Sequence, residues 1–263
     1  MPEWLRALKR FGKVLVVAVP AIYFVPKLFA VFALCGIYDV LRNKKVNREL
    51  LSQYFAGNGV FTWFMSPINM LLDVLCLPYW NKGIYKLEDL PTPYQQELKR
   101  VLDAAVSSNL VGKLEEKTRG QNRSMFFFKW YGGNVDNDLV IPAFHEDYKY
   151  IQTIGVSVFN KREVTNWHFG FMRASLRVLY NINDFDDQSA FIQVGPTMSY
   201  WKDDKLFIFD DTLLHLSANN SDKPRYCMFI DILRPSHLSA LLGAIMHLTG
   251  AISRPFNAVF YKK

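Results

Sequence analysis

The C-terminal half of the chain is built of short apolar and aromatic runs, separated by turns rich in Asn, Asp, Gly and Lys. Runs of this length and composition are typical of β-strands, and little intervening sequence has a helical pattern. A series of short strands without helices between them predicts a mainly β fold, a sandwich or jelly roll. The predicted strands are residues 124–131, 151–159, 173–182, 190–194, 197–201, 205–209 and 225–233.

The N-terminal region has longer uncharged runs. Residues 14–26 and 28–38 carry no charge and are separated by Lys27, and each run alone is too short to cross a bilayer. Together they predict one kinked span, with Pro20 and Pro26 at the kink, or a re-entrant hairpin. A pair of buried helices in a soluble protein is the alternative.

Two further segments are apolar. Residues 60–80 are rich in Trp, Phe and Met, which suits a membrane interface or a core beneath a loop. Residues 238–260 predict a helix that lies on a membrane or on the core. Between them, residues 92–110 predict a helix and residues 113–123 a loop. The chain therefore divides into an N-terminal membrane-anchoring segment (1–50), an interfacial patch with a helix (51–123), a β domain (124–236) and a C-terminal amphipathic or apolar helix (237–263).

Charge narrows the class of partner. The 263 residues have a net charge of +7 and a pI of about 9.2, which favours anionic partners. No helix-turn-helix, zinc-finger or RNP pattern is present, so no nucleic-acid partner is predicted. Basic residues stand on both sides of the first apolar segment, which favours anionic lipid on the cytoplasmic side. Three widely spaced cysteines in apolar surroundings predict free, buried thiols in a reducing compartment.

The candidate chemistry lies in the β domain. His168 is followed nine positions later by Arg177, and His215 ten positions later by Arg225. Histidine is a usual nitrogen ligand of Fe(II), and arginine clamps a carboxylate with its planar guanidinium group. Two such pairs fit an iron centre with a dicarboxylate co-substrate, although a histidine at a strand end is more often a surface residue.

These residues resemble the aspartyl/asparaginyl β-hydroxylase family of Fe(II)/2-oxoglutarate dioxygenases. Within that family, the chain is most similar to the bacterial lipid A 2-hydroxylase branch, which has an N-terminal membrane segment. Two other features of that branch have counterparts in residues 66–70 (SPINM) and in the aromatic strand 127–131 (FFKWY). The resemblance is carried by Ser157, His168-x-Gly170, Leu176-Arg177, Phe209-Asp210-Asp211, His215, Arg225 and the strand 229–235.

The resemblance implies a double-stranded β-helix and a role for each of these residues. His168 and His215 would bind Fe(II). Arg225, with Ser157, would hold the distal carboxylate of 2-oxoglutarate, and Arg177 would face the carboxylate next to the keto group. O₂ is the other co-substrate. Supporting roles fall to Asp211 and Asp210, of which Asp211 is the better placed to orient a ligand, and to Lys129 and Trp130 as possible substrate contacts. Lys129 is otherwise an ordinary surface lysine.

Two positions bear on activity. Many iron dioxygenases, lipid A hydroxylases included, carry an aspartate where this chain, like the aspartyl β-hydroxylases, has a glycine, Gly170, so iron would be held by two histidines, the co-substrate and water. Leu179 stands where the family commonly carries a histidine.

The favoured function is hydroxylation of a membrane lipid, such as a lipid A-like acyl chain. The catalytic domain would face the cytoplasm from the inner membrane, and no obligate protein partner is evident. The alternatives are hydroxylation of a peptide side chain, as in aspartyl or asparaginyl β-hydroxylation, and a non-catalytic membrane protein on a jelly roll.

Overall fold

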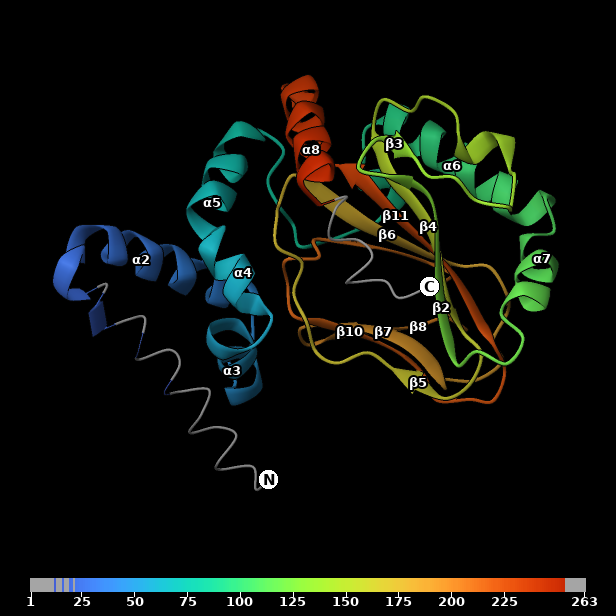
Figure 1. Ribbon diagram of the computed structural model, residues 1–263, viewed down its shortest axis with the longest axis horizontal. Helices are drawn as coiled ribbons and strands as arrows, with labels where there is room; N and C mark the ends of the chain where they lie inside the picture. The colour runs from blue at the N-terminus through green and yellow to red at the C-terminus, as the bar shows by residue number, and fades with distance from the viewer. Residues whose placement is uncertain (1–11, 13–15, 17–18, 21, 254–263) are drawn as a thin grey trace.

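The computed structural model describes residues 12, 16, 19–20 and 22–253, and it contains two antiparallel β-sheets that face each other (Figure 1). The larger sheet has seven strands in the order β1-β9-β6-β11-β4-β2-β3, and the smaller has four in the order β5-β10-β7-β8. The strands of the larger sheet are β1 (Ile84–Tyr85), β2 (Arg123–Trp130), β3 (Gly133–Asn134), β4 (Ile151–Phe159), β6 (Ser175–Asn181), β9 (Leu206–Phe209) and β11 (Arg225–Leu233). Those of the smaller sheet are β5 (Glu163–Val164), β7 (Ala190–Val194), β8 (Thr197–Tyr200) and β10 (His215–Asn219).

The predicted strands are confirmed: the bounds of β4, β7 and β11 are as predicted, and those of the others shift by one or two residues. β10 was not among them, because its five residues include His, Ser and Asn and lack a β-branched run. It forms because it pairs along its length with β7, a buried strand of the same sheet. The mainly β fold that the sequence predicts is therefore correct.

The register of the larger sheet separates two faces. In β11, Met228, Ile230 and Ile232 join a core cluster with the helices that cover the outer face. The alternate residue Cys227 joins a second cluster with Ile192 and Val194 of the smaller sheet. Because neighbours along a strand point to opposite faces, Arg225, Cys227, Phe229 and Asp231 share the inner face between the sheets. Direct cross-strand partners share a face, so Ser157, opposite Cys227, also lies there.

Three helices cover the outer face: α6 (Thr92–Ser107), α7 (Leu110–Lys117) and α8 (Ser239–Ser253) (Figure 1). The prediction of a loop from residue 113 is wrong in its first part, since α7 continues to Lys117. Leu110 and Leu114, one helical turn apart, are both fully buried and give this polar segment a single apolar stripe. The helix predicted over residues 92–110 is therefore two helices, which meet at Asn109 in a left-handed conformation.

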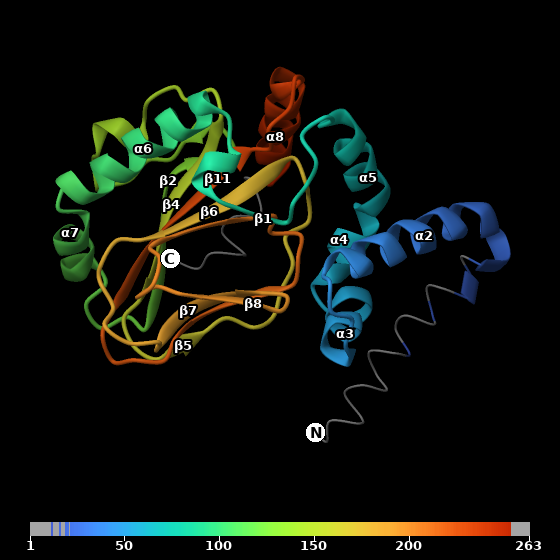
Figure 2. The same ribbon diagram turned by 180° about the vertical axis from the view of Figure 1, so that it is seen from behind.

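The N-terminal helices lie beside the two sheets rather than on the outer face (Figure 2). They are α2 (Pro26–Arg42), α3 (Arg48–Ala56), α4 (Gly59–Phe64) and α5 (Ser66–Leu75). α2 begins at Pro26, one of the two prolines at which the sequence predicted a kink, and proline suits the first turn of a helix. No helix in residues 22–253 is long and apolar enough to cross a membrane. Of the apolar stretch 14–38, residues 14, 15, 17, 18 and 21 lie outside the described part of the chain, as do residues 254–263 of the predicted tail helix.

A buried ionic network joins these helices to the β domain. Arg173, which is fully buried, donates hydrogen bonds to Asp39 of α2 and Asp73 of α5. Arg234 also donates to Asp73, and the Tyr54 hydroxyl of α3 donates to Asp39 at 2.8 Å. Removing one member of such a buried pair leaves an uncompensated charge, at a cost of about 3–5 kcal/mol. The N-terminal helices are therefore an integral part of the folded protein.

Candidate active site

His168 and His215 lie side by side where strand β10 of the smaller sheet begins. Their backbones form an isolated antiparallel bridge, with N–H to O distances of 3.0 Å in both directions. The two imidazole ring centres are 4.1 Å apart. His215 begins β10, whereas His168 lies in the segment that follows β5. The structure thus brings together two histidines that are 47 residues apart in the sequence, as the sequence analysis expected.

Both rings present one nitrogen for a metal. The Nδ1 atom of His168 lies 2.7 Å from the carbonyl oxygen of Asn166, and that of His215 lies 2.8 Å from the carbonyl oxygen of Leu213. A ring that donates from Nδ1 to a carbonyl keeps the lone pair on Nε2, the arrangement of metal-binding histidines. Burial lowers the pKa of both imidazoles, that of His215 well below its usual value. Neutral rings are the form that binds a metal.

Arg225 is a buried cation on the inner face. Its side chain donates to the hydroxyl of Ser157 at 2.9 Å and to that of Ser217, and its guanidinium lies 3.9 Å from the centre of the Phe159 ring. Its Nε has no hydrogen-bond partner, and no Asp or Glu of residues 22–253 forms an ion pair with it. Burial lowers the pKa of Arg225. A buried guanidinium without a protein carboxylate fits an acidic ligand.

Arg177 is held differently. Its Nε donates to Asp231 at 2.6 Å and its Nη2 to Asp211 at 2.9 Å, while its guanidinium lies 3.6 Å from the centre of the Phe229 ring. The two carboxylates already balance its charge. A co-substrate carboxylate would have to share Arg177 with Asp211 and Asp231, so Arg225 is the stronger candidate anchor.

Asp211 fills the space beside Gly170. A Cβ atom on residue 170 would lie 2.3 Å from the Asp211 carboxyl carbon, closer than real Cβ contacts allow. The Gly170 N–H also donates to the Asp211 carbonyl at 2.6 Å. Burial raises the pKa of Asp211 to about 7, against the opposing charge of Arg177. Glycine at position 170 is therefore a steric requirement of this site, because a carboxylate from another residue occupies the place of its side chain.

We expect Gly170→Asp to destabilise the protein by about 1–3 kcal/mol, the usual cost of overpacking, because it adds a second carboxyl group where Asp211 lies. Chemical denaturation measures this loss, and combining the change with Asp211→Gly should recover part of it. Gly243→Asp is the matched control, since a Cβ there meets only Leu233 at 3.8 Å. A Gly170→Asp protein as stable as the wild type would contradict this packing.

The remaining candidate residues are placed as follows. Asp210 faces the N-terminal helices, where it accepts hydrogen bonds from Arg42 of α2 and from Asn81. Burial alone would raise the pKa of Asp210, but Arg42 and Arg173 hold it well below its usual range. Lys129 pairs with Ile154, whose side chain belongs to the outer cluster, so Lys129 lies on the opposite face from Ser157. It is buried there, which excludes the surface-lysine interpretation.

Trp130 packs against the aromatic side chains of the inner face. Its ring centre is 4.5 Å from that of Phe127, which in turn is 6.0 Å from that of Phe229, the ring beneath Arg177. Leu179 belongs to the inner apolar cluster with Phe207 and Phe209. The centre of the Phe209 ring lies 5.0 Å from that of the His215 ring, so this apolar cluster packs against one side of the imidazole and excludes water there.

Two polar residues of the site were not predicted from the sequence. Ser217 holds Arg225, and Asp231 holds Arg177. Ser217 stands two positions after His215 on β10, so strand alternation would have placed both side chains on one face. Asp231 likewise stands six positions after Arg225 on β11, and this even spacing would have placed both side chains on the same face of the sheet.

The family follows from comparison with known sequences. Residues 94–235, more than half of the chain, match the family described as aspartyl/asparaginyl beta-hydroxylase, and the chain belongs to that family. It is an oxygenase of the hydroxylase type. No curated protein matches the sequence at a significant level.

Several solved structures are similar to parts of the chain. An oxidoreductase of the 2OG-Fe(II) oxygenase family from Burkholderia pseudomallei is 11% identical over 36% of this chain and 48% of its own, with a TM-score of 0.27. A cupin domain from Bordetella pertussis is 13% identical over 41% and 93%, with a TM-score of 0.25. A salicylate 1,2-dioxygenase from Pseudaminobacter salicylatoxidans is 10% identical over 60% and 38%, with a TM-score of 0.29.

The residues present fit iron and a dicarboxylate. Two neutral histidines with available Nε2 atoms suit Fe(II), and the buried Arg225 suits a carboxylate. Among the described residues, no group of three or more His, Cys, Asp or Glu side chains is placed to share a metal ion. His168 and His215 are the ligating side chains that the structure brings together here, and an iron site with two protein ligands stays a prediction.

Proposed function

We propose that the protein is an Fe(II)- and 2-oxoglutarate-dependent hydroxylase of a membrane lipid. The observation that carries the chemistry is the pairing of two neutral histidines with a buried arginine that has no carboxylate partner among the residues that the structure describes. His168 and His215 would hold the iron, and Arg225 with Ser157 and Ser217 the distal carboxylate of 2-oxoglutarate. When bound, iron and 2-oxoglutarate supply the activation of O₂.

The chain supplies position and a dry environment. The carbonyl oxygens of Asn166 and Leu213 fix the orientation of the two imidazole rings. The apolar cluster around Phe209 and Leu179 keeps water from one side of the histidines. Asp211, held by Arg177 next to Gly170, would orient a further ligand by hydrogen bonding. Ordered groups of this kind around a metal set its affinity and its accessible positions.

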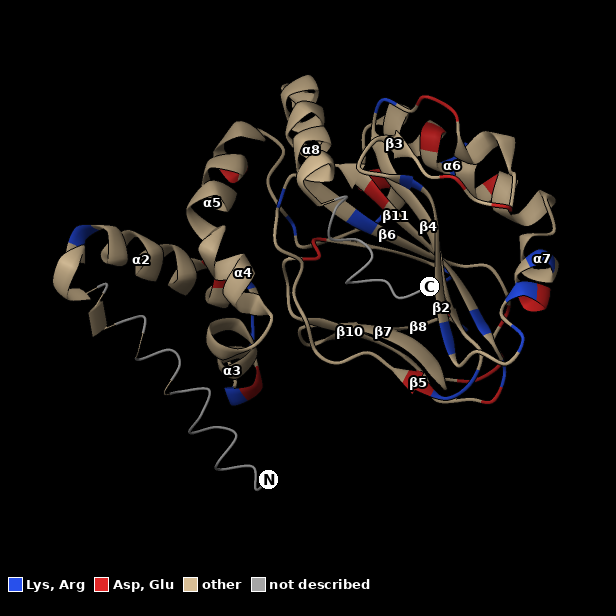
Figure 3. Ribbon diagram, in the orientation of Figure 1, with Lys and Arg blue, Asp and Glu red and all other residues tan. Residues whose placement is uncertain are grey.

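The exposed apolar surface supports a lipid substrate. Phe61 and Phe64 of α4 are 69% and 67% exposed, and Leu71 of α5 is 57% exposed. α4 and α8 contain no Asp, Glu, Lys or Arg, and α5 contains only Asp73 (Figure 3). Large exposed apolar patches mark interaction surfaces. We propose that these helices rest on the cytoplasmic leaflet of the inner membrane, as in the lipid A 2-hydroxylase branch that the sequence resembles.

We expect Phe61→Ser/Leu71→Ser to shift the protein from the membrane to the soluble fraction, because apolar burial supplies about 25 cal/mol per Å². Fractionation at low salt without detergent measures the shift. The matched control is Val106→Ser/Val140→Ser, which removes two exposed valines outside α4, α5 and α8. Wild-type protein that is soluble under these conditions would argue against the membrane surface.

Hydroxylation of an aspartyl or asparaginyl side chain is the second candidate, and the family match favours it. Mass spectrometry of total lipids and of the proteome separates the two. Cells that carry the wild-type chain should contain a lipid class heavier by one oxygen atom, and cells that carry His168→Ala should lack it. The same gain on peptides, with unchanged lipids, would transfer the assignment to the peptide hydroxylase. No gain in either class would favour a non-catalytic protein.

A further inference from the structure

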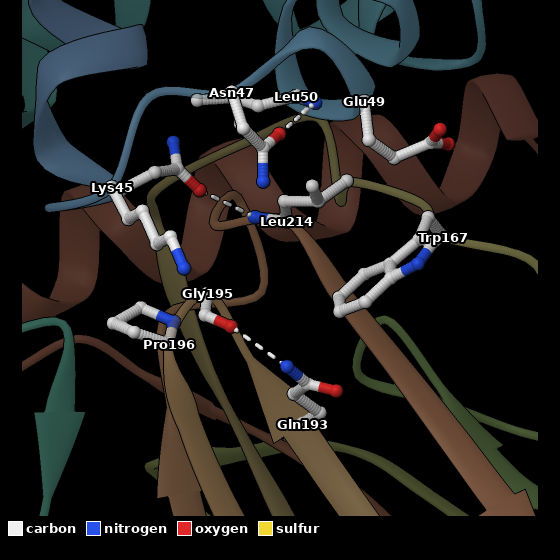
Figure 4. A pocket seen from close by; sticks show the side chains of 10 residues that line it. Lys45, Asn47, Glu49, Leu50, Trp167, Gln193, Gly195, Pro196 and Leu214 are labelled. Carbon is white, nitrogen blue, oxygen red and sulfur yellow. Dashed lines mark hydrogen bonds between the residues drawn. The ribbon is translucent and has the colours of Figure 1, made fainter.

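Two adjoining cavities lie between the end of α2 and the turn that joins β7 to β8. The larger, of about 420 Å³, is bounded by the C-terminal turn of α2, by residues 80–84 and by residues 194–197. The smaller, of about 260 Å³, shares Asn43, Gly195 and Pro196 with it. Figure 4 shows Lys45, Asn47 and Glu49 on one wall of the smaller cavity and Gly195, Pro196 and Gln193 on the other. Neither cavity is lined by His168, His215 or Arg225 themselves, but Trp167, Leu213 and Leu214 line them, so the cavities adjoin the two histidines from outside the candidate active site.

The larger cavity is cationic. Arg42, Lys44 and Lys82 line it, and its lining contains no Asp or Glu. Asp210 neutralises Arg42. Lys44 is exposed and forms no ion pair within residues 22–253. Lys82 is paired with Asp89 at 2.6 Å, but both side chains reach solvent, where such pairs are weak and exchange readily. Two lysines are therefore available to an anion.

The rim of the same cavity is apolar. Trp80, which is 66% exposed, and Leu41, which is 63% exposed, both line it. Leu34 and Ile37 are also exposed and stand two turns and one turn before Leu41, so the three form a stripe along α2 that leads to the cavity. Tryptophan beside lysine at the end of an apolar stripe is the arrangement found where proteins meet lipid headgroups.

We propose that this cavity binds the phosphate headgroup of a membrane phospholipid, with Lys44 and Lys82 on the phosphate and the acyl chains along Leu34, Ile37 and Leu41. The proposal rests on the membrane surface proposed above and adds the headgroup site. Leu213, on the inner wall, is the residue whose carbonyl oxygen orients His215. A headgroup bound there would fix the distance of the β domain from the membrane surface and its orientation relative to that surface.

The test is sedimentation of the full-length protein, without iron or 2-oxoglutarate, with phosphatidylcholine vesicles that contain or lack phosphatidic acid. Lys44→Gln/Lys82→Gln should weaken binding to the phosphatidic acid vesicles by roughly 30-fold, from two lysines on an anionic surface. Binding to pure phosphatidylcholine should not change. The control Lys99→Gln/Lys113→Gln removes the same charge from α6 and α7, far from α2 (Figure 1).

An equal loss in the control would overturn the proposal, because it would indicate attraction of net charge alone. Protection of the wild-type protein against heat by inorganic phosphate, without vesicle binding, would also overturn it and indicate a soluble phosphate ligand. Because no cofactor is present, a failure here leaves the hydroxylase assignment intact. Conversely, loss of lipid hydroxylation with unchanged vesicle binding would count against the hydroxylase and not against this site.

Discussion

Replacing His168 or His215 with alanine should abolish iron binding. His168 and His215 are the two proposed ligands, so each variant keeps a single imidazole, and the neighbouring Asp211 is already held by Arg177. Metal analysis after reconstitution with Fe(II) measures the loss directly. We expect stoichiometric iron in the wild type and none above background in either variant.

Controls separate ligation from folding. His215 is buried, and its removal leaves a cavity, so His215→Gln keeps most of the volume while it removes the imidazole. His237→Ala and His247→Ala remove histidines outside the site and should retain iron. Undiminished iron in the folded His168→Ala/His215→Ala double variant would show that the metal is held elsewhere.

Arg225→Ala should weaken 2-oxoglutarate binding by about 30-fold or more. A buried, hydrogen-bonded charge pair that loses one partner costs on the order of 2–5 kcal/mol. Arg225 has no carboxylate of its own among the described residues, and its two serine partners hold the guanidinium in place. Arg225→Lys should recover only part of the affinity, because lysine has no planar fork.

Calorimetric titration of the metal-loaded protein with 2-oxoglutarate measures this effect. Ser157→Ala and Ser217→Ala should each cause a smaller loss, since they remove one hydrogen bond and leave the charge. Arg162→Ala, at an exposed ion pair with Asp222, is the matched control. Wild-type affinity in Arg225→Ala would make Arg225 a purely structural residue and would move the anchor to Arg177.

Much of the fold could be predicted from local sequence. Strands β4 and β11 have the predicted bounds because their apolar runs are long and end at turn residues. The fold class and the His168–His215 pair could also be anticipated, the pair through its spacing to two arginines and its resemblance to a family motif. The three cysteines are free and buried, as their apolar surroundings predicted.

Other features depend on partners far apart in the sequence. Arg173 contacts Asp39 and Asp73, which are at least 100 positions away, so no local pattern showed that α2 and α5 are fixed to the β domain. Such ion pairs form only when folding brings the charges together in a place without water. The same reason explains Asp210, whose partner is Arg42.

The sequence by itself determined the longer apolar strands and singled out the two histidines and the arginine at position 225, because strand alternation and motif spacing are local properties. The tertiary structure decided how those groups are used. It paired Arg177 with Asp211 and Asp231, whereas no Asp or Glu of the described residues forms an ion pair with Arg225. It also placed the Asp211 carboxylate in the space beside Gly170. Electrostatic balance and steric exclusion depend on distances between residues remote in the chain, and only the packed fold sets those distances.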